Sequence, residues 1–233
     1  MLNLVVFQSM PGTTGSDTNY QLVSADTFQY AAALLNEVVV TQSKYEERQA
    51  IAKGLGYALM RGVEVTISGL FDTFSQITGS LGSEPDDAVL RRSWQYLRDA
   101  GITSNASWVF GPGAVAALFG NDKFTSSDFV GGGSVIESAK LPALYGYPAY
   151  ISNLLNAPAS GQTECALLHK EAVILIRQVK PTVKEQYLIR NLANGIVAFD
   201  IYGCEEAIWS AEAPTTDADP TVGDYGAVLI RTN

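Results

Sequence analysis

Few side chains in this sequence could serve as the reacting groups of an enzyme. His169 is the single histidine, which excludes a metal site built from several histidines. A hydrolase with a Ser-His-Asp triad would need His169 as its base. The serine nearest to a nucleophile motif is Ser80 in Thr78-Gly79-Ser80-Leu81-Gly82, which lacks the first glycine of GxSxG. We therefore expect His169, which precedes a buried strand, to be structural or exposed.

Acidic residues cluster in three places, but none of the clusters predicts a reaction centre. They are Asp86 with Asp87, Glu205 with Glu206, and Asp217 with Asp219 and Asp224. The first pair lies at an expected helix start, where capping accounts for it. The second pair follows a strand and indicates a solvated edge. The third group lacks the spacing of an EF-hand calcium loop.

The glycines, cysteines and tryptophans complete the search for functional groups. Gly131 to Gly133 are not followed by lysine, so they do not predict a phosphate-binding loop. Cys165 and Cys204 form no CxxC pair, and we expect two buried free thiols in a reducing compartment. The tryptophans suit either the core or an interface, and they are Trp94, Trp108 and Trp209. We assign no catalytic residue, no cofactor-binding residue and no metal ligand, and we expect no cofactor.

The composition restricts the classes of partner. The chain has 233 residues, of which 47% are hydrophobic and 17% charged, and its net charge is −9. The charged share is below the usual ~25% of soluble domains, so much of the surface must be uncharged or buried against partners. An acidic chain without a basic patch is not a general nucleic-acid binder, although an acidic wall could enclose nucleic acid without adhering to it. No apolar run approaches the ~18 residues of a membrane span, and the first residues do not resemble a secretory signal.

One long helix is expected over Thr41–Thr78, and the other elements are arranged around it. Its apolar residues recur at steps of three or four, which places them on one stripe of a helix. Its four glycines favour close packing or a bend, and we expect a break between Gly62 and Gly69. The stripe consists of Ile51, Leu55, Leu59, Val63, Ile67, Leu70, Phe74 and Ile77.

The other elements predict an α+β protein. A hairpin is expected from Leu2–Ser9 and Tyr20–Val23 around the turn-rich tip Pro11–Thr18. Phe28–Val40 is ambiguous, since Ala31–Leu35 favours helix and Val38–Val40 favours strand. Helices are expected at Glu84–Ala100, with Ser83 as its N-cap, and at Pro112–Phe119. Strands are expected at Trp108–Phe110, Ser134–Ala139, Leu144–Leu154, Ala172–Val179 (well buried), Gly195–Tyr202 and Gly226–Arg231.

The order of these features resembles the major capsid proteins of tailed bacteriophages, which share the HK97-type fold. The expected helix Thr41–Thr78, with Gly56-Tyr57-Ala58-Leu59 in its middle, looks like the family's spine helix, especially in its podophage-like branch. The resemblance covers the chain from Val38 onward, and it rests on the order of motifs that are weak alone. The later motifs are Trp108-Val109-Phe110-Gly111-Pro112, Tyr145–Leu154, His169–Val173, Gly195–Gly203 and Gly226–Arg231.

The resemblance implies an α+β HK97-type capsid fold with an E-loop, a long spine helix, a P-domain and an A-domain. Residues 1–38 would form the E-loop and a short N-terminal region. The P-domain would comprise residues 39–83 and 171–204, and the A-domain residues 84–170 and 205–233. Members of the family usually carry a longer N-terminal arm, so here the arm is short, the protein is processed, or the chain is incomplete.

The resemblance also implies a structural protein and not an enzyme. Such a protein self-assembles into the hexamers and pentamers of an icosahedral phage head that encloses double-stranded DNA. Its partners would be neighbouring copies of itself, with scaffolding, portal and decoration proteins, but neither a membrane nor a specific DNA sequence. It would be located in the virion after assembly in the host cytoplasm. An encapsulin-like nanocompartment shell and a small hydrolase that uses His169 are the alternatives.

Overall fold

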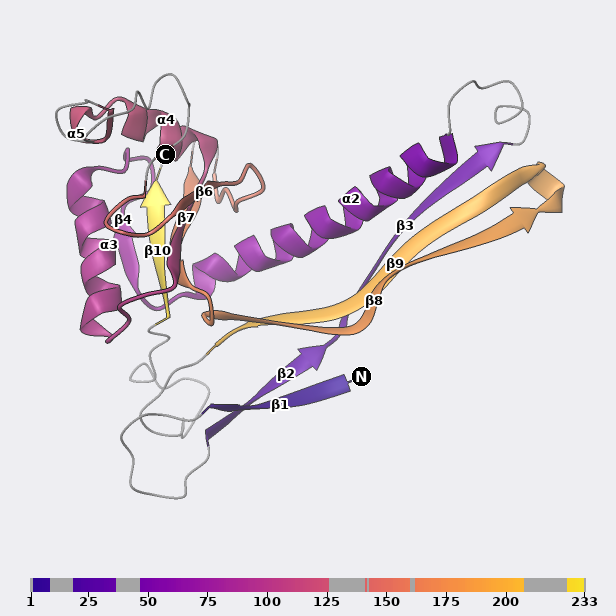
Figure 1. The fold of residues 1–233 in the computed structure, drawn as a ribbon, viewed down its shortest axis with the longest axis horizontal. Helices are drawn as coiled ribbons and strands as arrows, with labels where there is room; N and C mark the ends of the chain where they lie inside the picture. Colours follow the sequence, from indigo (N-terminus) through magenta and orange to yellow (C-terminus); the bar gives the residue numbers. More distant parts are fainter. Residues whose placement is uncertain are drawn as a thin grey trace. The chain divides into compact units, whose positions relative to one another are not determined.

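A computed structural model of the protein describes residues 2–8, 19–36, 47–125, 141, 143–159, 162–207 and 226–232 (Figure 1). The chain divides into two compact units. Unit 1 comprises Met1–Val6, Leu22–Thr66 and Leu175–Glu205, and unit 2 comprises Phe7–Gln21, Ile67–Ile174 and Glu206–Asn233. The expected hairpin is confirmed, because β1 (Leu2–Gln8) and β2 (Asn19–Ala25) form a two-stranded sheet. Its tip, Pro11–Thr18, lies outside the described residues.

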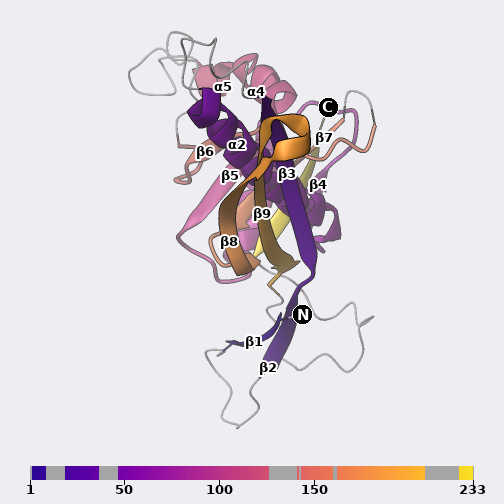
Figure 2. The same cartoon turned by 90° about the vertical axis from the view of Figure 1, so that its right-hand side faces the viewer.

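Unit 1 is a three-stranded sheet with a helix on one face. The strand order is β3-β9-β8, and the elements are β3 (Thr27–Asn36), β8 (Val173–Leu188), β9 (Ala193–Glu206) and α2 (Glu47–Gly69). The three strands run side by side in Figure 2. Leu55 and Leu59 of α2 pack on Leu35, Ile196 and Ala198 of the sheet. These contacts confirm the apolar stripe along the first part of the expected helix.

The strand β3 corrects the helical preference that was predicted for Ala31–Leu35. Each of its ten residues is paired with β9 in an antiparallel register, from Thr27 opposite Tyr202 to Asn36 opposite Ala193. Alternate β3 side chains face α2, and the side chains between them are exposed. Helix propensities of alanine and leucine differ from those of strand formers by under ~1 kcal/mol, so a ten-residue ladder of pairs outweighs them.

The helix α2 continues through the interval Gly62–Gly69 in which a break was predicted, and it ends at Gly69. It runs without interruption from Glu47 to Gly69, and the 3-10 helix η1 (Leu70–Thr73) follows. The segment 37–46 lies outside the described residues. The prediction of helix as far as Thr78 is wrong, because Ile77–Gly79 forms the strand β4. Thr78 pairs with Ile230 there, and a helix would forfeit those sheet contacts.

The glycines of α2 provide a test of the helix itself. Gly54 is exposed, and no atom lies within 4 Å of the position that a Cβ would occupy. We expect Gly54→Ala to raise the free energy of unfolding by about 1 kcal/mol, because alanine loses less backbone entropy in a helix. Urea unfolding followed by circular dichroism measures the change. A decrease in stability would contradict a regular helix at this position.

Unit 2 is built on a five-stranded sheet in the order β4-β10-β7-β5-β6. Its further strands are β5 (Ala106–Phe110), β6 (Ala149–Ile151), β7 (Thr163–His169) and β10 (Ala227–Thr232). One face is covered by α3 (Asp87–Asp99) and α4 (Pro112–Phe119), and the short α5 (Asp122–Thr125) follows α4. Phe71 and Phe74 pack on Ala166 and Leu229 of the other face. Side chains of β7 and β10 alternate between the two cores, as the period of a strand requires.

Several boundaries in unit 2 differ from those expected. The α4 bounds are confirmed, but α3 begins at Asp87 with Asp86 as its N-cap in place of Ser83. The strand β7 was not predicted, and it lies between β10 and β5 at the centre of the sheet. Only Ala149–Ile151 of the expected strand Leu144–Leu154 is a strand. The expected strand Ser134–Ala139 lies outside the described residues.

The two edges of the unit 1 sheet differ in chemistry. The β8 prediction of a well-buried strand is wrong, since only Ile176 of its sixteen residues is buried. The β8 edge carries Arg177, Lys180, Pro181, Lys184 and Glu185, which are residue types that protect an edge against further pairing. The β3 edge contains no charged residue and no proline. Among the described residues, β9 is the only strand that pairs with β3.

Candidate functional site

The structure does not bring the candidate triad residues together. His169 is half-buried at the end of β7, and its Nδ1 accepts a hydrogen bond from the backbone N–H of Glu171 at 3.4 Å. Ser80 is exposed, and its hydroxyl lies 3.4 Å from that of Ser83. Within the part of the chain that the structure describes, His169 makes no hydrogen bond to a serine or aspartate side chain. The geometry therefore gives His169 no triad partner among those residues.

Both cysteines are free thiols, as expected, but the expectation that both are buried holds only for Cys165. Cys165 is buried, and its Sγ accepts a hydrogen bond from the backbone N–H of Gly111 at 3.3 Å. Cys204 is only partly buried. Burial raises the pKa of the Cys165 thiol, and burial together with the nearby Glu205 carboxylate raises the pKa of Cys204 to about 11. Neither thiol is activated as a nucleophile, because both favour the protonated form.

Two of the tryptophans lie in the described part of the chain, and the third lies outside it with the glycine and aspartate clusters. Trp108 is fully buried in the core of unit 2, and its indole N–H donates to the carbonyl of Leu144 at 2.9 Å. Trp94 is partly buried on α3 against the same core. Trp209, Gly131 to Gly133 and the aspartates Asp217, Asp219 and Asp224 lie outside the described residues. Among the described residues, no three side chains gather in the manner of a metal site.

The acidic pairs have more specific roles than those predicted from the sequence. The Asp86 side chain accepts a hydrogen bond from the N–H of Val89 at 2.9 Å, which is the expected capping contact. The prediction that Glu205 and Glu206 form a solvated edge is wrong, because both lie within β9 and are only partly exposed. Glu206 accepts a hydrogen bond from the Thr73 hydroxyl at 3.0 Å. A strand that continues past Gly203 was not visible in the sequence.

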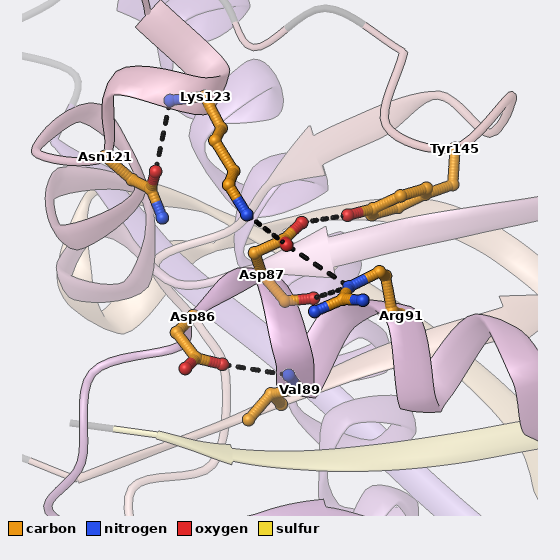
Figure 3. Close-up of polar contacts among 7 residues, drawn as sticks. All are labelled: Asp86, Asp87, Val89, Arg91, Asn121, Lys123 and Tyr145. Carbon is orange, nitrogen blue, oxygen red and sulfur yellow. Dashed lines mark hydrogen bonds and ion pairs between the residues drawn. The ribbon is translucent and has the colours of Figure 1, made fainter.

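Asp87 is the centre of a polar cluster that joins three segments of unit 2 (Figure 3). Its Oδ2 lies 2.7 Å from Lys123 Nζ of α5 and 3.2 Å from Arg91 Nε one turn along α3. Its Oδ1 accepts a hydrogen bond from the hydroxyl of Tyr145. Tyr145 and Gly146 have positive φ angles of 51° and 86°, which form the tight turn between the bridged residues Leu144 and Tyr147. The turn thereby directs Tyr145 toward Asp87.

The cluster shifts the ionisation of its members. Hydrogen bonds from Lys123 and then Tyr145 hold the pKa of Asp87 below its ordinary value of 3.8. Burial, followed by the hydrogen bond to the Asp87 carboxylate, raises the pKa of Tyr145. Asp87 is thus the ionised acceptor of the cluster, and Tyr145 is a protonated donor. The cluster binds segments of the chain together and leaves no free base for a reaction.

The cluster predicts an acid-sensitive contribution to stability. Because the folded pKa of Asp87 is depressed, its contribution is present above pH 3.8 and is lost as the pH falls through the folded pKa. We expect Asp87→Asn to lower the free energy of unfolding near neutral pH by about 1–2 kcal/mol. The difference from the wild type should vanish in acid below that window. Urea unfolding at a series of pH values measures it, and a difference that grows with acidity would contradict the assignment.

A second carboxylate in unit 2 is almost fully buried. Glu164 of β7 is 1% exposed, and it accepts a hydrogen bond from Asn156 Nδ2 at 2.6 Å. Arg231 Nε lies 4.0 Å from its other oxygen, and the Arg231 guanidinium also pairs with Asp72 at 3.1 Å. Burial is the largest effect on Glu164 and raises its pKa. These contacts join β7, β10 and η1 within the unit.

The open face of the unit 1 sheet is apolar and exposed. Phe28, Tyr30 and Leu34 of β3 are 58%, 67% and 61% exposed. The Phe28 ring stacks on Tyr30 with centroids 5.9 Å apart, and it lies 6.3 Å from the ring of Phe199 on β9. Val197 shares this face, because it lies opposite Ala32. We call these residues the β3 face: Phe28, Tyr30, Ala32, Leu34, Val197 and Phe199. A contiguous exposed apolar surface of this kind is typical of a contact with another protein.

Comparisons with solved structures find this fold in viral and encapsulin shells. The chain matches a structure from Mycobacterium phage Che8 with a TM-score of 0.75 and 17% identity, over 98% of this chain and 83% of that one. It matches the capsid structure of cyanophage P-SCSP1u with a TM-score of 0.71 and 13% identity, over 99% and 82%. It matches the SrpI encapsulin of Synechococcus elongatus PCC 7942 with a TM-score of 0.60 and 13% identity, over 98% and 81%.

The chain therefore has the HK97-type fold of phage capsids and encapsulins, as its motif order predicted. No protein-family model matches the sequence, and no curated protein matches it significantly. Within the described residues, no helix combines the length and the apolar character that crossing a bilayer would require.

Proposed function

We propose that the protein is the major capsid protein of a tailed bacteriophage, a structural and non-enzymatic subunit of the virion. The observation that carries the proposal is the fold itself, which matches phage capsid structures over 98–100% of the chain. Many copies would associate as hexamers and pentamers into an icosahedral head around double-stranded DNA. The low share of charged residues, 17%, suits a subunit that covers broad surfaces with copies of itself.

The proposal gives each part of the chain a role. The β1–β2 hairpin within residues 1–38 would be the E-loop, and α2 would be the spine helix. Residues 39–83 with 171–204 would form the P-domain, and residues 84–170 with 205–233 the A-domain. Scaffolding, portal and decoration proteins would be further partners during and after assembly in the host cytoplasm. The net charge of −9 would keep an inner wall from adhering to the packaged DNA.

Electron microscopy of the purified protein tests the proposal directly. Negative staining should show closed shells of uniform size, because heterologous contacts between identical subunits close into rings and shells. Sedimentation velocity provides the matching measurement in solution. A strictly monomeric protein at high concentration, with a cooperative unfolding transition, would contradict the proposed function.

The β3 face is the surface that we propose to contact a neighbouring subunit. Tyr30→Asp places a charge at the centre of this face, and we expect it to raise the critical concentration for assembly about 30-fold or more, since a hot-spot residue contributes roughly 2 kcal/mol. Tyr57→Asp is the matched control, because Tyr57 of α2 is 69% exposed and Tyr30 is 67% exposed in the same unit. Light scattering measures assembly, and circular dichroism confirms that both variants fold. Equal assembly of the two variants would exclude the β3 face.

An encapsulin-like nanocompartment is the second candidate, and the likeness to the SrpI encapsulin supports it. The two functions differ in what the shell contains. A phage head holds nucleic acid, whereas a nanocompartment holds protein. The ratio of absorbance at 260 and 280 nm, measured on nuclease-treated shells from a native source, separates them.

A further inference from the structure

An open groove of about 520 Å³ lies in unit 2, between the end of α3, the chain before β5 and the Tyr145–Gly146 turn. Two cationic side chains, Arg98 and Lys170, line it, and no carboxylate does. The remaining lining residues that matter here are polar, namely Thr103, Ser104, Asn105 and Ser107. The chain has 24 acidic and 15 basic residues, so its net charge is negative. The groove has the opposite sign, because two cations and no acid line it.

Arg98 is held in place by aromatic rings and not by an acidic partner. Its guanidinium carbon lies 5.0 Å from the centroid of the Trp94 ring and 5.9 Å from that of Tyr147. Stacking of this kind fixes the plane of a guanidinium and leaves its N–H edge available. Among the described residues, no carboxylate lies within ion-pair distance of Arg98, and no atom accepts a hydrogen bond from its guanidinium.

The groups around Arg98 are hydrogen-bond donors that lack acceptors. Arg98 Nε, Trp94 Nε1 and the Tyr147 hydroxyl are all buried without a hydrogen-bond partner in the described part of the chain. Tyr147 is 4% exposed, so its hydroxyl cannot obtain a partner from bulk water. Buried hydrogen-bond donors normally have acceptors. Here several donors lie beside a cationic groove and have no acceptor among the described residues.

Lys170 adds a second positive charge at the rim. It lies 3.6 Å from Glu171, but both side chains are more than half exposed, at 59% and 53%. An exposed pair of this kind is weak and can exchange partners at little cost. The backbone N–H of Lys170 donates to the carbonyl of Asn105 at 3.0 Å, which holds the lysine beside the polar residues of the groove.

We propose that this groove binds an oxyanion, a carboxylate or phosphate group, with the Arg98 guanidinium as its principal ligand. The planar fork of arginine matches two oxygens of either group, and Lys170 adds charge without fixed geometry. The polar side chains of Thr103, Ser104 and Ser107 supply further donors. The site is independent of whether the protein forms a shell.

Titration of the unassembled full-length protein with inorganic phosphate tests the proposal. Binding changes the tryptophan fluorescence, because Trp94 lies under the guanidinium that takes up the ligand. Sodium chloride at the same ionic strength controls for screening. We expect saturable binding of phosphate, and of malonate as a carboxylate probe, with no response to chloride. A linear response without saturation for both probes would overturn the proposal.

The variants have a matched control on the same helix. Arg98→Met should weaken binding about tenfold or more, since charge-assisted hydrogen bonds are lost. Arg92→Met should bind like the wild type, because Arg92 also lies over a ring, that of Tyr96 at 5.5 Å, but does not line the groove. Lys170→Met, at an exposed position, should fold normally and weaken binding several-fold. Unchanged binding by both Arg98→Met and Lys170→Met would overturn the site.

The source of the oxyanion is distinguished by repeating the titration on assembled shells. If the shells no longer respond to phosphate, a neighbouring copy covers the groove on assembly. If shells and free subunits respond equally, the ligand is a free ion. Both results support the oxyanion site, and failure of the protein to assemble would affect only the proposed function.

Discussion

Trp108→Ala is expected to lower the free energy of unfolding by about 3–5 kcal/mol, the usual cost of removing a large buried aromatic ring. Trp108 is 0% exposed on the central part of the unit 2 sheet. Its ring stacks on Phe110 at a centroid distance of 5.7 Å, and the two planes differ by 10°. The substitution leaves a cavity between β5 and the helices that cover it. The Leu144 carbonyl also loses the hydrogen bond that it accepts from the indole N–H.

Urea unfolding followed by far-ultraviolet circular dichroism measures this loss. Trp108→Phe is the informative control, because it retains most of the apolar volume but removes the hydrogen bond to Leu144. We expect it to cost about 1–3 kcal/mol, from the loss of one of the two hydrogen bonds to the Leu144 carbonyl, which still accepts from the N–H of Tyr147 at 3.0 Å, together with a smaller cavity. A loss below ~1 kcal/mol for Trp108→Ala would show that this core does not hold unit 2 together.

Gly203→Ala should be the most damaging of the small substitutions in unit 1. Gly203 lies in β9, and a Cβ at this position would overlap the carbonyl oxygen of Ser24 and lie 2.7 Å from its carbonyl carbon. Both are backbone atoms, so no side-chain rotation can relieve the overlap. We expect a loss of about 3 kcal/mol or more, because the strand must move to admit one methyl group.

The control for this prediction lies on the same strand. A Cβ at Gly195 would have the Leu188 Cδ1 as its nearest atom, at 3.4 Å, and that atom ends a flexible side chain. We expect Gly195→Ala to change stability by less than ~1 kcal/mol. Thermal unfolding of the two variants under identical conditions compares them. Equal stability of Gly203→Ala and Gly195→Ala would contradict the close approach of β9 to Ser24.

The sequence predicted those elements whose signals are local. The bounds of α4 coincide with Pro112 at its first position and Gly120 at its C-cap, and α2 ends at Gly69, so local residue types mark these boundaries. The pairing of β3 was missed, since its alanines and leucines favour helix until β9 lies beside them. The N-cap of α3 moved from Ser83 to Asp86 because both residue types cap well and only the tertiary position of the chain decides between them.

The functional features depend still more on long-range assembly. Asp87 was correctly placed at a helix start, but its contacts with Lys123 and Tyr145 lie 36 and 58 residues away. The groove combines residues from Arg98 to Lys170, and no short motif carries such a signal. The β3 face was hidden for another reason. In the sequence, both sets of alternate β3 residues are largely apolar. Only the structure shows which set faces α2 and which set is exposed.

The uncharged edge of β3 has a consequence for the protein in a test tube. Every second residue of this ten-residue strand turns its backbone N–H and C=O away from β9, toward the edge that no described strand pairs. If the protein assembles as proposed, ordered assembly in one orientation competes with non-specific association through this edge in many orientations. Non-specific association becomes more frequent as concentration and temperature rise, because it requires no alignment of the partners. The yield of non-aggregated protein should therefore depend on the order in which the sample is diluted, cooled and mixed, even when every molecule is correctly folded.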